Sequence, residues 1–377
     1  MGNIKNYAVD YYDETLDIIR DLCKIPAPSG KEEKRAEYCL NWLLENGAAG
    51  AYIDDALNVI YPHNCDGSND ITVVVAHTDT VFPDTEPMPF SEDDEKMYSP
   101  GVGDDTASVG VLLMTARYFI RNNIKPEGGI LFVCNSCEEG LGNLKGVKEI
   151  MRAYEGRVKQ LVSFDKSYFG GIQKKCVGSC RYEVEVTTPG GHSFGKFGEK
   201  NAIAELSKIV AKIYELKVPR IEHTITTYNV GSIEGGTSVN TIAQSAKMLC
   251  EYRSDSSECL EIMGKHFDEI FEGAKGDHVD VNVKVIGVRP CEKGVDPEKK
   301  QALLNQLSDA MISVVGGEIK YCSMSTDCNI PLSMGIPASC IGVFYGGGAH
   351  TREEWIEKKS IRTGLEVGIT SLLALFE

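Results

Sequence analysis

A short apolar run that ends in a histidine and an aspartate constrains the fold of this chain more than any other feature. Residues 71–76 read Ile-Thr-Val-Val-Val-Ala, and His77-Thr78-Asp79 follow directly. Such a short run, rich in β-branched residues, predicts a strand buried on both faces of a sheet. Neither His77 nor Asp79 suits a core, and both stand where a parallel strand leaves its sheet. In open α/β folds, ligands bind outside these carboxyl ends.

Alternation along an extended chain places residues two apart on the same side of the strand. His77 and Asp79 can therefore face one cleft, with Asp79 turned back to hold the imidazole. A carboxylate behind a histidine is a common way to fix the tautomer of a ring that binds a metal. A strand-end histidine with a capping aspartate, and no metal, explains the same segment equally well, so the rest of the chain must decide.

Length and charge narrow the class of protein. A chain of 377 residues predicts two domains. The net charge of −16 argues against nucleic-acid binding, which needs a positive field. No apolar run approaches the roughly 18 residues of a membrane span, and residues 1–20 lack the apolar centre of a signal peptide. We therefore expect a cytoplasmic protein with no membrane partner.

The 13 cysteines predict reduced thiols, because their number is odd and the chain is large. Cys134 and Cys137 form a Cys-x-x-Cys pair that a zinc site or a redox site would use. However, Cys134 falls inside a predicted buried strand, where a thiol is usually inert.

Two further predicted strands also end in carboxylates. Residues 128–133 precede the pair Glu138-Glu139, and residues 160–164 precede Asp165. Paired carboxylates repel each other unless one is protonated or a metal is bound. Neighbours in an extended chain point to opposite sides, so one can bind a metal while the other acts on water.

A glycine-rich loop adds another acidic pair. Asp104 and Asp105 follow Gly103 and come just before the predicted helix 109–122. One of the two aspartates can simply cap that helix. Taken with the strand ends, however, the loop predicts a rim of five side chains: His77, Asp104, Glu138, Glu139 and Asp165.

Adding the histidine after the loop Gly346-Gly-Gly-Ala gives five candidate metal ligands: His77, Asp104, Glu139, Asp165 and His350. Imidazole nitrogen mixed with carboxylate oxygen suits zinc, or manganese or cobalt, better than calcium or magnesium. Five ligands are too many for one catalytic zinc, but they suit two metals that share a carboxylate. Glu138 then remains as the general base, which takes a proton from the bridging water and passes it to the leaving amine.

The periodicity changes near Cys180. Alternating strands and helices follow in the order β-α-β-β-α-β, which predicts a ferredoxin-like domain inserted at about residues 179–290. Residues 1–178 and 291–377 then form the catalytic domain. At its start, apolar residues at helical spacing predict one amphipathic helix over residues 7–24.

The ordered set of motifs His77-Thr-Asp79, Gly103-Asp104-Asp105, Glu138-Glu139-Gly140, Asp165 and Gly-Ala-His350 resembles that of the co-catalytic zinc exopeptidases. This family includes peptidase T, carboxypeptidase G, acetylornithine deacetylase and succinyl-diaminopimelate desuccinylase. The resemblance covers nearly the whole chain. It implies a three-layer αβα catalytic domain with a mixed, mostly parallel sheet, and an inserted α+β domain that acts as a lid and in dimerisation.

The resemblance also implies residue roles. Asp104 would bridge two metal ions, His77 and Asp165 would complete one site, and Glu139 and His350 the other. Asp79 would support His77, and Glu138 would be the base.

Three residues of the inserted domain carry further implied roles. His192 is similar to a lid histidine that stabilises the oxyanion, often across a dimer, and a lone loop histidine is the alternative. Asn240 and Arg253 resemble contacts to polar groups of the substrate, although Arg253 can equally form a surface salt bridge.

The substrate is the least constrained property. In the family that this chain resembles, aspartate at the position of Asp165 is commoner in aminopeptidases and dipeptidases, whereas deacylases and carboxypeptidases more often carry glutamate. We therefore expect an aminopeptidase acting on short peptides. The alternatives are an N-acyl-amino-acid deacylase or carboxypeptidase with the same chemistry, and an inactive homologue kept for binding.

Overall fold

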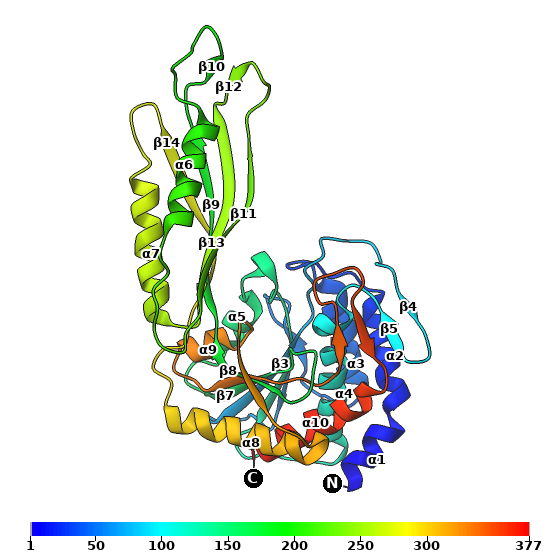
Figure 1. Ribbon diagram of the computed structural model, residues 1–377. Coiled ribbons are helices and arrows are strands. Elements are labelled where there is room, and N and C mark those ends of the chain that lie inside the picture. The colour runs from blue at the N-terminus through cyan, green and yellow to red at the C-terminus, as the bar shows by residue number, and fades with distance from the viewer. Residues whose placement is uncertain (1, 377) are drawn as a thin grey trace. The chain divides into compact units, whose positions relative to one another are not determined.

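The computed structural model describes residues 2–376 and divides into two compact units (Figure 1). The first unit combines the residues up to 176 with those from 293 onward, and the second consists of residues 177–292. These limits lie two residues from the boundaries expected from the sequence. The roles of the second unit as a lid and in dimerisation stay predictions.

A six-stranded sheet runs through the first unit in the order β1-β2-β6-β3-β7-β16. Strands β6, β3, β7 and β16 are mutually parallel, whereas β1 and β2 are antiparallel at one edge. The strands are β1 (Tyr52–Ile53), β2 (Val59–His63), β3 (Ile71–His77), β6 (Ile130–Asn135), β7 (Val158–Ser163) and β16 (Ala338–Cys340). This is the mixed, mostly parallel sheet that the sequence predicted.

Side chains alternate along the central strands and fill two separate apolar cores. Val74 and Ala76 of β3 lie in one core, and Val73 and Val75 lie in the other. Helices cover both faces, so the unit has three layers. The first core is covered by α1 (Gly2–Asp10), α2 (Tyr12–Cys23), α3 (Glu33–Glu45), α4 (Ala107–Arg121), α8 (Pro297–Val315) and α10 (Ser360–Ala374), and the second by α5 (Lys145–Ala153) and α9 (Asn329–Ser333).

The single helix predicted over residues 7–24 is wrong, because the chain forms two helices there. Helix α1 ends at Asp10 and α2 begins at Tyr12. Tyr11 between them has φ −113° and ψ 14°, which is not helical. Buried apolar residues continue on both sides of the break, so the spacing of apolar residues did not reveal it.

The second unit is built on a four-stranded antiparallel sheet in the order β11-β13-β9-β14. Helices α6 and α7 pack on one face of this sheet and enclose its own apolar core (Figure 1). In chain order the elements are β9 (Gly178–Thr187), α6 (Ala202–Glu215), β11 (Thr226–Gly235), β13 (Ser245–Ser254), α7 (Ser257–Glu272) and β14 (Asp280–Arg289). The order and the pairing are those of a ferredoxin-like domain.

Smaller elements complete the two units. In the second unit, β10 (Gly191–His192) pairs with β12 (Thr241–Ile242). In the first, β8 (Gly171–Cys176) pairs with β15 (Lys320–Met324), and a small antiparallel sheet contains β17 (Gly346–Gly347), β18 (Trp355–Glu357), β5 (Lys96–Tyr98) and β4 (Ser91–Glu92). Short helical turns cover Val102–Thr106 and Gly140–Gly142.

Two further findings bear on the composition. None of the helices that the structure describes combines the length and the apolar character needed to cross a bilayer. All 13 cysteines are free thiols. A hydrogen bond with Cys39 and burial raise the pKa of the Cys134 thiol well above its usual value.

Candidate metal centre

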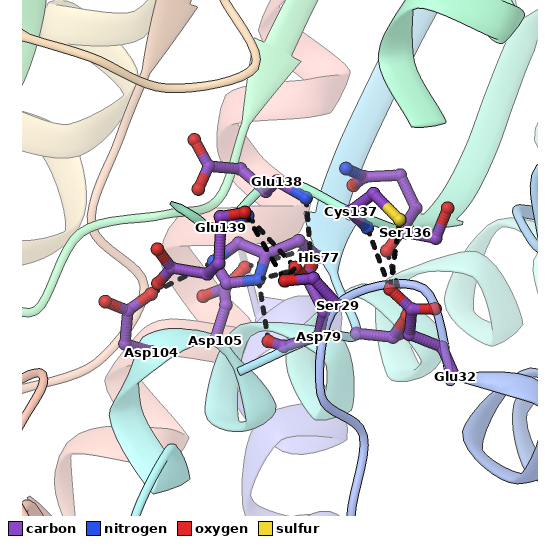
Figure 2. Close-up of polar contacts among 12 residues, drawn as sticks. Ser29, Glu32, His77, Asp79, Asp104, Asp105, Ser136, Cys137, Glu138 and Glu139 are labelled. Atoms are coloured by element: carbon purple, nitrogen blue, oxygen red, sulfur yellow. Dashed lines mark hydrogen bonds and ion pairs between the residues drawn. The ribbon is translucent and has the colours of Figure 1, made fainter. Parts of the chain in front are cut away.

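Three parallel strands end beside one another in the first unit. Strand β3 ends at His77, β6 continues into the pair Glu138-Glu139, and β7 ends two residues before Asp165. Because β3 is parallel to both β6 and β7, the three carboxyl ends share one edge of the sheet. Figure 2 shows His77, Asp104, Glu138 and Glu139 gathered at this edge.

Asp104 presents one carboxylate oxygen to each of two imidazoles. Its Oδ1 lies 3.0 Å from Nε2 of His77, and its Oδ2 lies 3.0 Å from Nε2 of His350. The same nitrogen of His350 lies 3.2 Å from Oε1 of Glu139. His77 and Glu139 are buried, whereas the side chain of His350 is 58% exposed. The cluster is therefore closed on the His77 side and open to solvent on the His350 side.

The donor atoms fit a divalent metal ion. One ligand atom from each of His77, Asp104 and Glu139 lies within 4.8 Å of the other two. This combination of imidazole nitrogen and carboxylate oxygen suits zinc, manganese or cobalt. Asp104 also faces His350 with its other carboxylate oxygen.

Charges are crowded in the cluster. Burial lowers the pKa of His77, but hydrogen bonds with Asp104 and Asp79 outweigh it and hold that pKa well above its usual value. Hydrogen bonds with Asp104 and Glu139 raise the pKa of His350 to about 10. Burial, together with the charge of Asp104, raises the pKa of Asp165. A bound cation would relieve the same repulsion between carboxylates.

Asp79 supports both His77 and the backbone of the paired glutamates (Figure 2). Its Oδ1 lies 3.4 Å from Nδ1 of His77 and accepts a hydrogen bond from the N–H of Glu138 at 2.9 Å. Its Oδ2 accepts hydrogen bonds from the N–H of Glu139 at 3.0 Å and from the hydroxyl of Ser29 at 2.6 Å. The backbone carbonyl of Asp79 lies 3.0 Å from Nδ1 of His77. One buried residue thus fixes two of the converging segments relative to each other.

Glu354 holds the loop that carries Asp104. Its carboxylate accepts hydrogen bonds from the backbone N–H groups of Gly101, Gly103 and Asp104 at 2.7, 2.9 and 2.7 Å. Burial and the charge of Asp104 raise the pKa of Glu354 to about 7. Gly103 leaves room for this contact, since a Cβ there would lie 2.9 Å from Oε1 of Glu354.

Glu138 and Asp165 lie in the same neighbourhood. Glu138 is 4% exposed, and its charge contributes to the raised pKa of Asp165. Asp165 and Asp104 line one cavity. The first unit therefore brings together seven of the residues predicted from the sequence: His77, Asp79, Asp104, Glu138, Glu139, Asp165 and His350.

Two of the remaining predicted residues are neighbours in the second unit. His192 is exposed, and its Nδ1 accepts hydrogen bonds from the backbone N–H groups of Phe194 and Gly195 at 3.3 Å. The backbone carbonyl of Asn240 accepts a hydrogen bond from the N–H of Ser193 at 3.0 Å.

Arg253 lies apart from His192 and Asn240 within that unit. Its guanidinium donates to both carboxylate oxygens of Glu251, at 2.7 and 3.1 Å. Strand β13 begins at Ser245, close after β12, and about 26 Å of strand separate Ser245 from Arg253 at roughly 3.3 Å per residue. The second unit alone therefore does not bring Arg253 into one site with the other two.

Sequence reasoning missed three side chains that hold the site's loops, namely the acceptors Glu354 and Glu32 and the hydroxyl donor Ser29. Oε1 of Glu32 accepts hydrogen bonds from the N–H groups of Gly30 at 2.9 Å and Cys137 at 3.1 Å. Glu354 and Glu32 bind backbone N–H groups, which almost every residue type offers, so no residue spacing could reveal these pairings. The one available signal is that Glu354 follows the glycine loop by a few residues.

Comparison with known proteins identifies relatives over most of the chain. Residues 73–373 match the sequence model of peptidase family M20/M25/M40. The chain is similar to succinyl-diaminopimelate desuccinylase of Corynebacterium glutamicum, with 25% identity over 92% of each chain. It is also similar to acetylornithine deacetylase of Myxococcus xanthus, with 23% identity over 69% of this chain and 70% of that protein.

Solved structures share the fold. Aminopeptidase PepT from Bacillus cereus superimposes with a TM-score of 0.75 at 22% identity, over 97% of this chain and 99% of that one. A tripeptidase from Staphylococcus aureus superimposes with a TM-score of 0.77 at 21% identity, over the same shares. Because the family match spans far more than half of the chain and includes every strand end of the site, this protein belongs to peptidase family M20/M25/M40.

Proposed function

We propose that this protein is a metal-dependent exopeptidase that hydrolyses an amide bond in short peptides, acting as an aminopeptidase. The observation that carries the proposal is the carboxylate of Asp104, which offers one oxygen to His77 and the other to His350. A carboxylate shared in this way suits a site for two metal ions. Membership of peptidase family M20/M25/M40 supports the same conclusion.

In this proposal, Asp104 would help to hold two zinc ions, or manganese or cobalt in their place. His77 and Asp165 would supply the other ligands of one ion, and Glu139 and His350 those of the other. Such ions supply Lewis-acid chemistry at the scissile carbonyl. Asp79 holds the Nδ1 side of the His77 ring, so that Nε2 is directed toward the ligand cluster.

Glu138 is the general base of the proposed reaction. Its neighbour Glu139 faces His350, so the two adjacent carboxylates divide metal binding and proton transfer between them. Glu138 takes a proton from the attacking water and donates it to the leaving amine. The hydrogen bond from its backbone to Asp79 keeps it in place during both transfers.

The substrate class rests on two supports. In the family that this chain resembles, aspartate at the position of Asp165 is commoner in aminopeptidases and dipeptidases than in deacylases and carboxypeptidases. The chain also shares its fold with proteins described as an aminopeptidase and a tripeptidase. The second candidate is an N-acyl-amino-acid deacylase or carboxypeptidase, which the 25% identity to a desuccinylase over 92% of the chain favours.

Free tripeptides of the Gly-Gly-Leu type, compared with their N-acetylated forms, test this proposal in the presence of zinc, manganese or cobalt. We expect cleavage of the free peptides from the amino end, and no cleavage of the acetylated ones. Cleavage of the acetylated forms alone would establish the deacylase or carboxypeptidase instead. A protein that binds no metal and cleaves neither would be an inactive homologue.

Glu138→Gln tests the assignment of the base separately. The variant should bind the metals of the wild type, as elemental analysis measures, and lose activity by at least about a hundredfold, since general-base catalysis contributes about 10²–10⁴-fold. Hydrolysis within a few fold of wild type would show that another group accepts the proton.

The second unit completes the proposal. Within a homodimer formed through this unit, His192 would stabilise the oxyanion, and Asn240 and Arg253 would contact polar groups of the substrate. For Arg253 this role requires the guanidinium to exchange Glu251 for the substrate, because the two are paired in the structure.

A further inference from the structure

A small cavity adjoins the candidate metal centre in the first unit. Its volume is about 190 Å³, and Asp104 and Asp165 form part of its wall. Pockets for drug-sized ligands measure roughly 300–1,000 Å³, so this cavity suits a single side chain or a short acyl group. The rest of the wall comes from Gly103, Lys166, Ser167, Tyr168, Met324, Phe344, Gly347, Ala349 and Glu354.

Lys166 brings a buried positive charge to this wall. Its side chain follows Asp165 directly, and the residue is 9% exposed. Its Nζ lies 3.2 Å from Sγ of Cys322, 3.1 Å from Sδ of Met324, and 4.4 Å from the centre of the Tyr168 ring. Sulfur atoms and an aromatic face are weak partners for an ammonium group. Over the described residues 2–376, Lys166 forms no ion pair with a carboxylate.

The carboxylates of the cavity wall are engaged elsewhere. Glu354 accepts hydrogen bonds from three backbone N–H groups, and Asp104 faces the two imidazoles. Asp165 is a proposed metal ligand. Among the charged groups of this wall, Lys166 is the one for which the described residues provide no carboxylate partner. Burying an ammonium group without a carboxylate partner costs free energy. This indicates that a bound ligand supplies the partner.

Two glycines leave room for the lysine and the residues beside it. A Cβ at Gly171 would collide with Cε of Lys166 and lie 2.6 Å from the Tyr168 ring. A Cβ at Gly342 would collide with the backbone carbonyl of Tyr168 and lie 3.0 Å from that of Lys166. Both the stem and the backbone of Lys166 thus pack against positions that lack side chains. A larger residue at either position would displace Lys166 from the cavity wall.

We propose that Lys166 recognises a carboxylate on the substrate and directs the enzyme to substrates that carry an acidic group beside the scissile amide. This inference rests on the proposed hydrolytic function. Two kinds of substrate have this chemistry: a peptide with Asp or Glu next to the cleaved bond, and an amino acid acylated by a short dicarboxylic acid. A charge-assisted hydrogen bond is stronger in a largely desolvated cavity than in water.

The test compares substrates that differ only in a carboxylate or the carboxamide of the same shape. The pairs are Glu-Gly-Gly with Gln-Gly-Gly, Gly-Glu-Gly with Gly-Gln-Gly, and N-succinyl-leucine with N-succinamoyl-leucine. We expect the wild type to favour the acidic member of at least one pair by about 10- to 100-fold in kcat/KM. The pair that shows the preference identifies which group enters the cavity.

Lys166→Met should remove this preference, because it keeps a stem of similar length without the charge. We expect kcat/KM for the acidic substrate to fall by about the wild-type preference, mainly through KM, while the amide substrate stays within about threefold. Lys166→Arg should retain the preference. Lys174→Met is the matched control, since Lys174 is exposed on the neighbouring strand β8 and its Nζ lies 5.4 Å from the centre of the Tyr321 ring.

Melting temperature and metal content are measured for each variant, and Lys166→Gln replaces Lys166→Met if that variant does not fold. Equal cleavage of both members of every pair by the wild type would overturn the inference and leave the hydrolase intact. Equal loss on both members in Lys166→Met, with loss of metal, would show that Lys166 only balances the charge of the centre. A wild type that holds two metals and cleaves no substrate would overturn the proposed function, and this inference with it.

Discussion

At the scale of single residues, Asp79 does more than its position after His77 suggests. The spacing predicts a carboxylate behind an imidazole, and the structure places Oδ1 of Asp79 3.4 Å from Nδ1 of His77. The same carboxylate also accepts hydrogen bonds from the backbones of Glu138 and Glu139 and from the hydroxyl of Ser29. Asp79 therefore positions the proposed base and a proposed ligand together.

Asp79→Asn should impair both tasks, because the amide NH₂ of asparagine would face one of the backbone N–H groups of Glu138 and Glu139, which need an acceptor. Removing the outer partner of a metal ligand typically costs 10- to 100-fold in metal affinity or activity. We expect a loss of about this size in kcat/KM, together with lower metal content by elemental analysis. Ser29→Ala is the control, since it removes one hydroxyl donor and leaves the backbone contacts; it should cost less than about fivefold. Wild-type rate and metal content in Asp79→Asn would contradict this role.

At the scale of elements, helix α4 is almost wholly buried and carries a charge in its middle. Arg117 is 1% exposed and donates to both carboxylate oxygens of Glu14 and to the hydroxyl of Tyr7. Its guanidinium also lies 4.4 Å from the centre of the Tyr11 ring. This one side chain links α4 to α1, to α2 and to the residue where these two helices are broken apart.

Arg117→Met should therefore destabilise the first unit. Arg117 is buried, but the side chain of Glu14 is 43% exposed, so the cost is that of leaving buried hydrogen-bonding groups without partners, about 1–3 kcal/mol. We expect a fall of that order in the free energy of unfolding measured with urea. Arg152→Met offers a matched control on α5, because the side chain of Arg152 is 72% exposed and pairs with Glu149, three residues away on the same helix. The control should stay within about 0.5 kcal/mol of wild type. Equal effects of the two substitutions would contradict the structural role of Arg117.

Elements and site were predictable from the sequence to different degrees. The central strands were recognisable because both of their faces are buried and their sequences are therefore almost wholly apolar. The polar and charged residues that follow them could then be identified as candidate site residues. The break between helices at Tyr11 could not be predicted, because apolar residues continue on both sides of it. Glu354 and Ser29 escaped notice because their partners are far away in the chain. Glu354 accepts from backbone N–H groups, and the hydroxyl of Ser29 donates to the carboxylate of Asp79. The pairing of Arg253 with Glu251 depends on strand geometry that residue types alone do not reveal.

At the scale of the whole molecule, the second unit has the properties of an independent domain. It has a core of its own, with side chains such as Val184 and Phe267 fully buried. Its first and last strands pair directly, with Ser179 opposite Arg289. Its two ends therefore lie about 5 Å apart, the spacing of neighbouring strands. A chain can leave and re-enter the first unit through such a junction without distortion of either part.

Residues 177–292 expressed alone should fold. We expect a single cooperative thermal transition by circular dichroism and a near-ultraviolet signal from packed aromatic residues such as Tyr182. The complementary variant, in which a short Gly-Ser linker joins residue 176 to residue 293, should still bind metal, because all five proposed ligands lie in the first unit. A fragment without a cooperative transition would show that the second unit depends on the first.

The arrangement of several strand ends at one edge of the sheet also has a consequence for when the candidate site forms during folding. His77, Glu139 and Asp165 are distant along the chain and become neighbours only when β3 has paired with β6 and β7. Pairings between such distant segments are slow steps in folding, because the closure of long loops must come first. The unfolded chain has no assembled set of ligands to offer, so a metal ion stabilises the folded protein by mass action. Activity is then a property that the polypeptide gains last, after its central sheet is complete.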